Sequence, residues 1–163
     1  DELVDVALST AARSFHVDVE ESSWKDLLRS YAREVWRLCE EFPGLSTVIF
    51  DYPLAFSHIL PKAEQLMARL VSLGLTELQA GFAIDFIGDT VLGTHIPISS
   101  MRRVDESGQT GLERVEARLV DLGISPEKDL PLTPDESWMG TGNLDLKLEF
   151  ILAGLEAGLP KEN

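Results

Sequence analysis

Residues 76–98 constrain the fold more than any other part of the chain, because they are apolar on almost every side when drawn as a helix. Thr76 and Gln79 form a T-x-x-Q capping box, which predicts that a helix begins here. Two apolar arcs follow at about 100° per residue. The first contains Ala80, Ala83, Ile84, Ile87, Val91 and Ile98, and the second contains Leu78, Phe82, Phe86, Leu92 and Ile96. We therefore expect a helix that neighbours cover on several sides.

Asp85 and Asp89 lie one helical turn apart inside the second apolar arc. Carboxylates among apolar side chains need either a partner in a cavity or access to water. One interpretation is that they receive a cationic or hydrogen-bond-donating ligand. The alternative is that they line a solvated groove or pair with an arginine of a second copy.

The composition indicates one domain with an acidic surface. The chain has 163 residues, and 28 acidic against 14 basic residues give a formal charge of −14. Such a surface repels phosphate, so we expect no grip on nucleic acid or on anionic membranes. No apolar run approaches the roughly 18 residues that span a bilayer, and the acidic start is unlike a signal peptide. The lone Cys39 excludes an internal disulfide, and we expect a cytoplasmic protein with an inert core thiol.

The remaining pattern is helical throughout. The apolar spacing predicts helices over residues 2–16, 23–42, 110–122 and 144–159, and another that begins at Ser57 or Pro61 and ends before Gly74. Thr110 and Glu113 form a second capping box. The short segment 45–52 has β-branched residues, but no partner strand is evident, so a short helix is preferred. Asn143 is expected to cap the last helix. Residues 125–142, which are rich in proline and glycine, are expected to form single turns only.

The last helix has two apolar faces, of which one can pack on the domain. One face carries Leu144, Leu148, Ile151, Leu152, Leu155 and Leu159, and the other carries Leu146, Phe150, Ala153 and Ala157. The second face needs another partner, and a second copy of the chain is the simplest candidate.

Several short motifs occur in a familiar order. Residues 24–33 resemble the opening of the fifth helix in tetracycline-repressor-like (TetR/AcrR) regulators, and Phe42-Pro43-Gly44-Leu45 resembles the "H-P-x-L" that follows. Residues 66–80 resemble the joint between the seventh and eighth helices. Val91-Leu92-Gly93 and residues 150–155 are similar to the later "v-x-G" and the closing "F-x-x-x-L-x-G-L". The order and spacing of these pieces carry the resemblance.

The resemblance implies an all-α regulatory domain that binds a small, largely apolar effector and forms a homodimer. Two helices, 76–98 and 143–159, would form a four-helix seam with their copies. Residues 1–15 resemble the linking fourth helix. Because the chain does not begin with Met, we expect a helix-turn-helix domain upstream, which alone would contact DNA. Asp85 and Asp89 depart from the family pattern.

Two sets of site residues follow. The predicted ligand-binding residues are Tyr31, Val35, Leu66, Met67, Leu70, Phe82, Asp85, Phe86 and Asp89. The predicted dimer-interface residues are Gly81, Ile84, Gly88, Val91, Leu92, His95, Leu148, Ile151, Leu152 and Leu155. The alternative for each is an ordinary place in the core.

The chain carries no catalytic signature. It has no G-x-S-x-G, P-loop or G-x-G-x-x-G motif, and His16, His58 and His95 lie in separate segments without metal-ligand spacing. We expect neither an enzyme nor a cofactor or metal. Two other hypotheses stay open: a ligand-free helical interaction module, and a helical enzyme that uses Asp85, Asp89 and a histidine.

Overall fold

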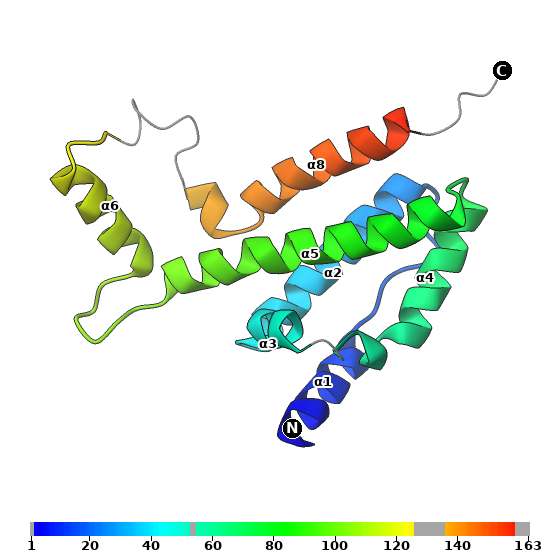
Figure 1. Ribbon diagram of the computed structural model, residues 1–163, viewed down its shortest axis with the longest axis horizontal. Helices are drawn as coiled ribbons and strands as arrows, with labels where there is room; N and C mark the ends of the chain where they lie inside the picture. The colour runs from blue at the N-terminus through cyan, green and yellow to red at the C-terminus, as the bar shows by residue number, and fades with distance from the viewer. Residues whose placement is uncertain (1, 53–54, 126–135, 159–163) are drawn as a thin grey trace.

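The long helix α5 runs through the middle of the domain. The computed structural model describes residues 2–52, 55–125 and 136–158, and α5 (Glu77–Arg102) is its longest element (Figure 1). The predicted capping box is present: the Gln79 amide donates to Thr76 Oγ1 over 3.2 Å, and the Thr76 amide donates to Gln79 Oε1 over 2.9 Å. The helix continues four residues beyond the predicted end at Ile98, because Pro97 removes only one donor from the helix.

Helices surround α5 on several sides, as its apolar circumference predicted. α2 lies behind it, α4 crosses near its start, and α8 runs alongside it (Figure 1). The bounds are α1 Glu2–Ser14, α2 Trp24–Glu41, α3 Leu45–Asp51, η1 Ala55–His58, α4 Leu60–Ser72, α6 Gly111–Asp121, η2 Glu136–Met139 and α8 Gly142–Ala157. Across the described ranges the chain forms helices, turns and a single isolated β-bridge, so the all-α prediction is confirmed.

Local boundaries differ from the prediction at several points. Residues 45–51 form the predicted short helix, and Gly44 begins it at a φ of 88°, where a side chain would be strained. The first helix ends two residues early, at Ser14. The predicted Asn143 cap is wrong: Thr141 precedes α8, and its hydroxyl donates to Asp145 over 2.9 Å. Residues 126–135 of the proline-rich segment lie outside the described residues, and η2 is a single 3₁₀ turn.

The core joins α2, α4, α5 and α8. Among its fully buried side chains are Leu27, Leu28, Leu66, Leu70, Ile87, Ile98, Leu144 and Leu152. Each fully buried aliphatic side chain contributes about 1.5–3 kcal/mol to folding. This packing fixes the rotation of α5 about its own axis, and therefore decides which of its residues face outward.

A buried polar network fixes the second half of α5 to α2 and α3. His95 is 3% exposed, with Nδ1 3.0 Å from Ser46 Oγ and Nε2 2.9 Å from Glu40 Oε1. Both terminal nitrogens of Arg102 donate to the Glu40 carboxylate over 2.9 Å. Hydrogen bonds from Arg102 hold the pKa of Glu40 below its usual value. Burial lowers the pKa of His95, although Glu40 opposes this shift.

This geometry suits a neutral His95, and that makes stability depend on pH. Because the folded pKa lies below the unfolded value of about 6.5, the unfolded chain binds more protons as the pH falls past that value. The contribution of His95 is therefore complete above about pH 6.5 and declines below it. Glu40 acts in a lower range, because its pKa is lowered from an already acidic value.

We predict that the free energy of unfolding, measured with urea, falls between pH 7.5 and 5.5. His95→Gln should lower stability at pH 7.5 by about 1–3 kcal/mol, because buried hydrogen-bonding groups lose their partner, and should flatten the pH dependence. His16→Gln, at an exposed position, is the control and should change neither. An equally steep pH dependence in His95→Gln would contradict this role of His95.

Candidate functional site

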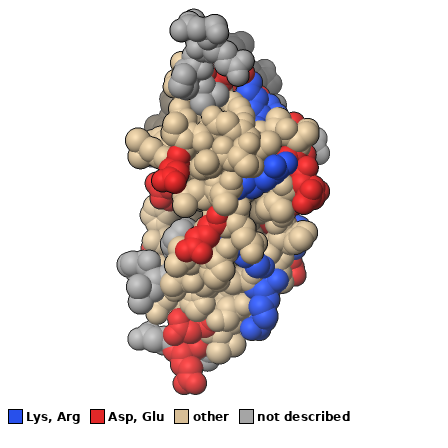
Figure 2. Space-filling model, turned by 90° about the vertical axis from the view of Figure 1, so that its right-hand side faces the viewer, with Lys and Arg blue, Asp and Glu red and all other residues tan. Residues whose placement is uncertain are grey.

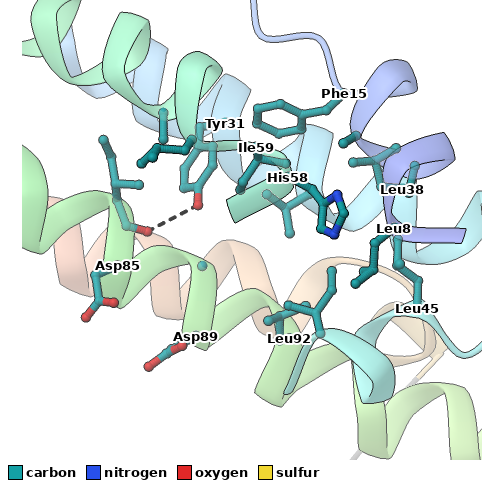
Figure 3. A pocket seen from close by; sticks show the side chains of 18 of the residues that line it. Leu8, Phe15, Tyr31, Leu38, Leu45, His58, Ile59, Asp85, Asp89 and Leu92 are labelled. Atoms are coloured by element: carbon teal, nitrogen blue, oxygen red, sulfur yellow. Dashed lines mark hydrogen bonds between the residues drawn. The ribbon is translucent and has the colours of Figure 1, made fainter. Parts of the chain in front are cut away.

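A cavity of about 700 Å³ lies between α5 and the segment formed by α1, α2, α3, η1 and α4 (Figure 3). Most of its wall is apolar, and the side chains at its deeper end come from several helices: Leu8, Ala11, Phe15, Leu38, Leu45 and Ile59. Leu8, Ala11 and Phe15 are all nearly buried. The first helix therefore forms part of the cavity wall.

Tyr31 on α2 is the polar group placed most firmly at the cavity. Its hydroxyl donates to the Ile84 carbonyl over 3.2 Å, and its ring forms a T-shaped contact with the Phe15 ring, with the centroids 6.2 Å apart. Burial, followed by the charges of Asp85 and Asp89, raises the pKa of Tyr31, so the phenol stays protonated. The phenol oxygen keeps free lone pairs for another donor.

Gly88 makes room for this hydroxyl. A Cβ at Gly88 would lie 3.0 Å from Tyr31 Oη, whereas a Cβ at Gly93 on the same helix would meet nothing within 4 Å. Gly88 and Gly81, predicted for the dimer interface, both line the cavity instead. The side of α5 that carries these two glycines therefore faces the cavity.

Asp85 and Asp89 lie at one edge of the cavity. Figure 3 shows both near the Tyr31 hydroxyl, with carboxylates directed away from Leu8 and Phe15 at the opposite end. Both are exposed. Within the described part of the chain, neither forms an ion pair or a hydrogen bond. They reach water, which resolves the cost of placing charge in an apolar arc.

His58 and Lys62 connect the cavity wall to α1. His58 lines the cavity, with Nδ1 3.2 Å from Ser9 Oγ and Nε2 3.4 Å from an oxygen of Asp5. Lys62 Nζ donates to the Ala12 carbonyl over 2.7 Å and to the carbonyl of Phe15. A cation at these final carbonyls satisfies orphan acceptors and favours the helix dipole.

Five of the nine predicted ligand-binding residues line the cavity: Tyr31, Val35, Met67, Asp85 and Asp89. Leu66 and Leu70 are 1% and 0% exposed and belong to the core behind it. Phe82 and Phe86 lie on another side of α5. Phe15, His58 and Glu64 also line the cavity, and they were not predicted to do so. In the sequence, side chains that line a cavity have the same pattern as side chains that pack against a solid core.

A second hollow of about 760 Å³ lies between α5 and α8. The rings of Phe82 and Phe86 stack there, with their centroids 5.6 Å apart and an interplanar angle of 11°, and Phe150 lines the same hollow. The predicted interface residues divide among three places. Ile151 and Leu155 line this groove; Ile84 and Leu92 line the cavity; Val91, His95, Leu148 and Leu152 are buried inside the protomer.

Ser46, His95 and Glu40 form a chain that resembles a serine-hydrolase triad, but its geometry does not suit catalysis. Ser46 and His95 are 2% and 3% exposed, and neither lines a detected hollow. A nucleophile needs space for a reacting carbonyl. Among the described residues, no three or more metal-binding side chains lie close enough to hold an ion. Burial raises the pKa of the Cys39 thiol to about 12, which keeps it protonated.

The helices packed around α5 define an all-α domain. The family model described as "Tetracyclin repressor-like, C-terminal domain" matches residues 18–161, so the chain belongs to this family. Such domains generally mediate dimerisation and effector binding. No curated protein and no solved structure gives a significant match. None of the described helices has the length and apolar character needed to cross a membrane.

We predict that Gly88→Ala and Gly93→Ala differ in stability. Gly93→Ala should gain up to about 1 kcal/mol from helix propensity. Gly88→Ala should gain less or destabilise, because its Cβ crowds the Tyr31 hydroxyl. In a Tyr31→Phe background the two substitutions should have equal effects in chemical denaturation. Equal effects in the wild-type background would show that Gly88 does not control the position of Tyr31.

Proposed function

We propose that this chain is the effector-sensing and dimerising domain of a transcription regulator, with the cavity beside α5 as the effector site. The observation that carries the proposal is an apolar cavity of about 700 Å³ whose wall includes α1. Ligand sites typically have volumes of about 300–1,000 Å³, mostly apolar walls and a few placed polar groups. Here Tyr31, His58, Asp85 and Asp89 are such groups.

The coupling element of the proposal is α1. A ligand that fits one position of Leu8 and Phe15 better than another shifts the population between those positions. The contacts of His58 and Lys62 with α1 would couple η1 and α4 to the same movement. A DNA-binding domain attached to α1 would then change its spacing within a dimer. The formal charge of −14 supports a DNA contact made by another domain.

The dimer surface of the proposal is the open face of α5 and α8. Leu78 and Phe150 are 83% and 81% exposed there, and Phe82, Phe86 and Leu146 are also exposed. Figure 2 views the end of the domain where α5 begins and α8 ends; most of this face is uncharged, with small, separate acidic and basic groups. The exposed apolar side chains of α5 and α8 favour a second copy as their cover. Ile151 and Leu155 remain in the proposed interface.

Filling the cavity should prevent binding. Ala63 is nearly buried in the cavity wall, and Ala68 is exposed on the same helix. We expect the neutral apolar dye Nile red to bind the wild-type chain and Ala68→Trp with similar affinity in fluorescence titrations. Ala63→Trp should bind at least about tenfold more weakly, because the indole occupies the space.

Circular dichroism checks that the Trp variants fold, and Ala63→Phe is the smaller substitute if Ala63→Trp does not. Unchanged binding in a folded, filled variant would reject the cavity as the effector site. Such a result would favour the ligand-free interaction module.

Charge on the open face should dissociate the dimer. Phe150→Glu should weaken dimerisation by about 2–4 kcal/mol, the usual effect of losing a central aromatic anchor. Val120→Glu on α6, at another exposed apolar position, is the matched control and should stay dimeric. Size-exclusion chromatography with light scattering measures both. A wild-type monomer at high micromolar concentration would reject this part of the proposal.

A further inference from the structure

Three carboxylates lie around the cavity without a cationic partner. Asp85 and Asp89 come from α5 and Glu64 comes from α4, and all three line the cavity. In the parts of the chain that the structure describes, none of them is paired with Lys, Arg or His. Asp85 and Asp89 are also like charges one helical turn apart, an arrangement that a nearby cation relieves.

Positive charge is nearly absent from the rest of the wall. None of the described lining residues is Lys or Arg. Lys62 lies on α4 beside the lining residues, with its ammonium group 5.7 Å from the centroid of the Phe15 ring, and it donates to the carbonyls of Ala12 and Phe15. His58 is the one basic side chain among the described lining residues, and it already faces Asp5 and Ser9.

The neutral groups of the cavity also suit a cation. Tyr31, Phe50 and Tyr52 line it, and aromatic ring faces attract ammonium and delocalised cations. The Tyr31 hydroxyl uses its proton on the Ile84 carbonyl, so its oxygen faces a ligand as an acceptor.

We propose that the effector is a lipophilic cation: its apolar body lies between Leu8, Phe15 and Leu38, and its positive nitrogen lies at the Asp85–Asp89 edge. This inference rests on the proposed function, because it assigns a charge to the ligand of the same cavity. Figure 3 shows Leu8 and Leu38 on the side of the site opposite Asp85 and Asp89, so an apolar part and a charged part of one molecule would each meet suitable side chains.

The test compares two dyes with nearly the same benzophenoxazine skeleton: neutral Nile red and cationic Nile blue. We expect Nile blue to bind about tenfold more tightly at pH 7 and physiological ionic strength, since one charge within a few ångströms of two solvated carboxylates gains roughly this factor. Asp85→Asn with Asp89→Asn should remove the preference, so that this variant binds Nile blue and Nile red with about equal affinity.

The control is Glu116→Gln with Asp121→Asn, which removes the same formal charge from α6. Neither residue lines a detected hollow, and α6 lies beyond the far end of α5 (Figure 1). This variant should retain the preference for Nile blue. It would lose the preference only if the dye were attracted by the total negative charge of the protein. All four side chains are exposed, and thermal unfolding verifies that both variants remain folded.

The outcomes separate the two levels of the proposal. Equal affinities for the two dyes, or a preference that survives Asp85→Asn with Asp89→Asn, would overturn the proposal that the ligand is a cation. Binding of Nile red would in that case still support the cavity as the effector site. A preference lost equally in the α6 control would overturn the cationic ligand as well. If neither dye binds, or if Ala63→Trp leaves binding unchanged, the proposed effector site fails together with its charge.

Discussion

The burial of α5 on several sides is the constraint on which the rest of the structure depends. Ile87, Val91 and Ile98 on this helix are all 0–1% exposed, and each contributes about 1.5–3 kcal/mol through burial. These contacts fix the rotation of the helix, so Asp85 and Asp89 face the cavity while Phe82 and Phe86 face the α8 groove. In the proposed regulator, one rigid helix therefore carries both the effector site and the dimer surface, and coupling between them has a physical route.

The polar network at the other half of α5 has a positioning role. The bidentate pair of Arg102 and Glu40 and the buried His95 join α5 to α2 and α3. α3 supplies Leu45, Ile49 and Phe50 to the cavity wall. Ser46 and His95 are buried, so removing either would leave a buried polar group without its partner. The network thus holds the wall beside the cavity while its opposite side, α1, is held by fewer contacts.

Local signals in the sequence predicted most of the fold. The capping boxes at Thr76 and Thr110 involve residues three positions apart, so they need no tertiary information, and both are present. The same reasoning failed at Asn143, because the chain before α8 enters the helix two residues earlier, at Thr141. Family resemblance supplied the arrangement that periodicity alone does not give.

The candidate site was predictable only in part, because an apolar arc has the same appearance beside a core, a cavity or a second copy. Tyr31, Asp85 and Asp89 were found through their chemistry. Phe82 and Phe86, predicted for the ligand site, line the hollow beside α8, since two apolar sides of α5 give no sign of which one α8 covers. The contribution of α1 and His58 depends on where α1 and η1 pack relative to α5, which no local pattern in the sequence shows.

Hydrogen exchange with and without Nile red tests whether the ligand binds in the cavity between α1 and α5, because it distinguishes the two hollows. If the cavity is the binding site, we expect slower amide exchange on binding in residues 8–15 and in residues 84–92 of α5, which contribute to its wall. We expect little change in residues 146–155 of α8. Protection confined to α8 and the Phe82–Phe86 side of α5, with α1 unchanged, would contradict an effector cavity that is coupled to α1.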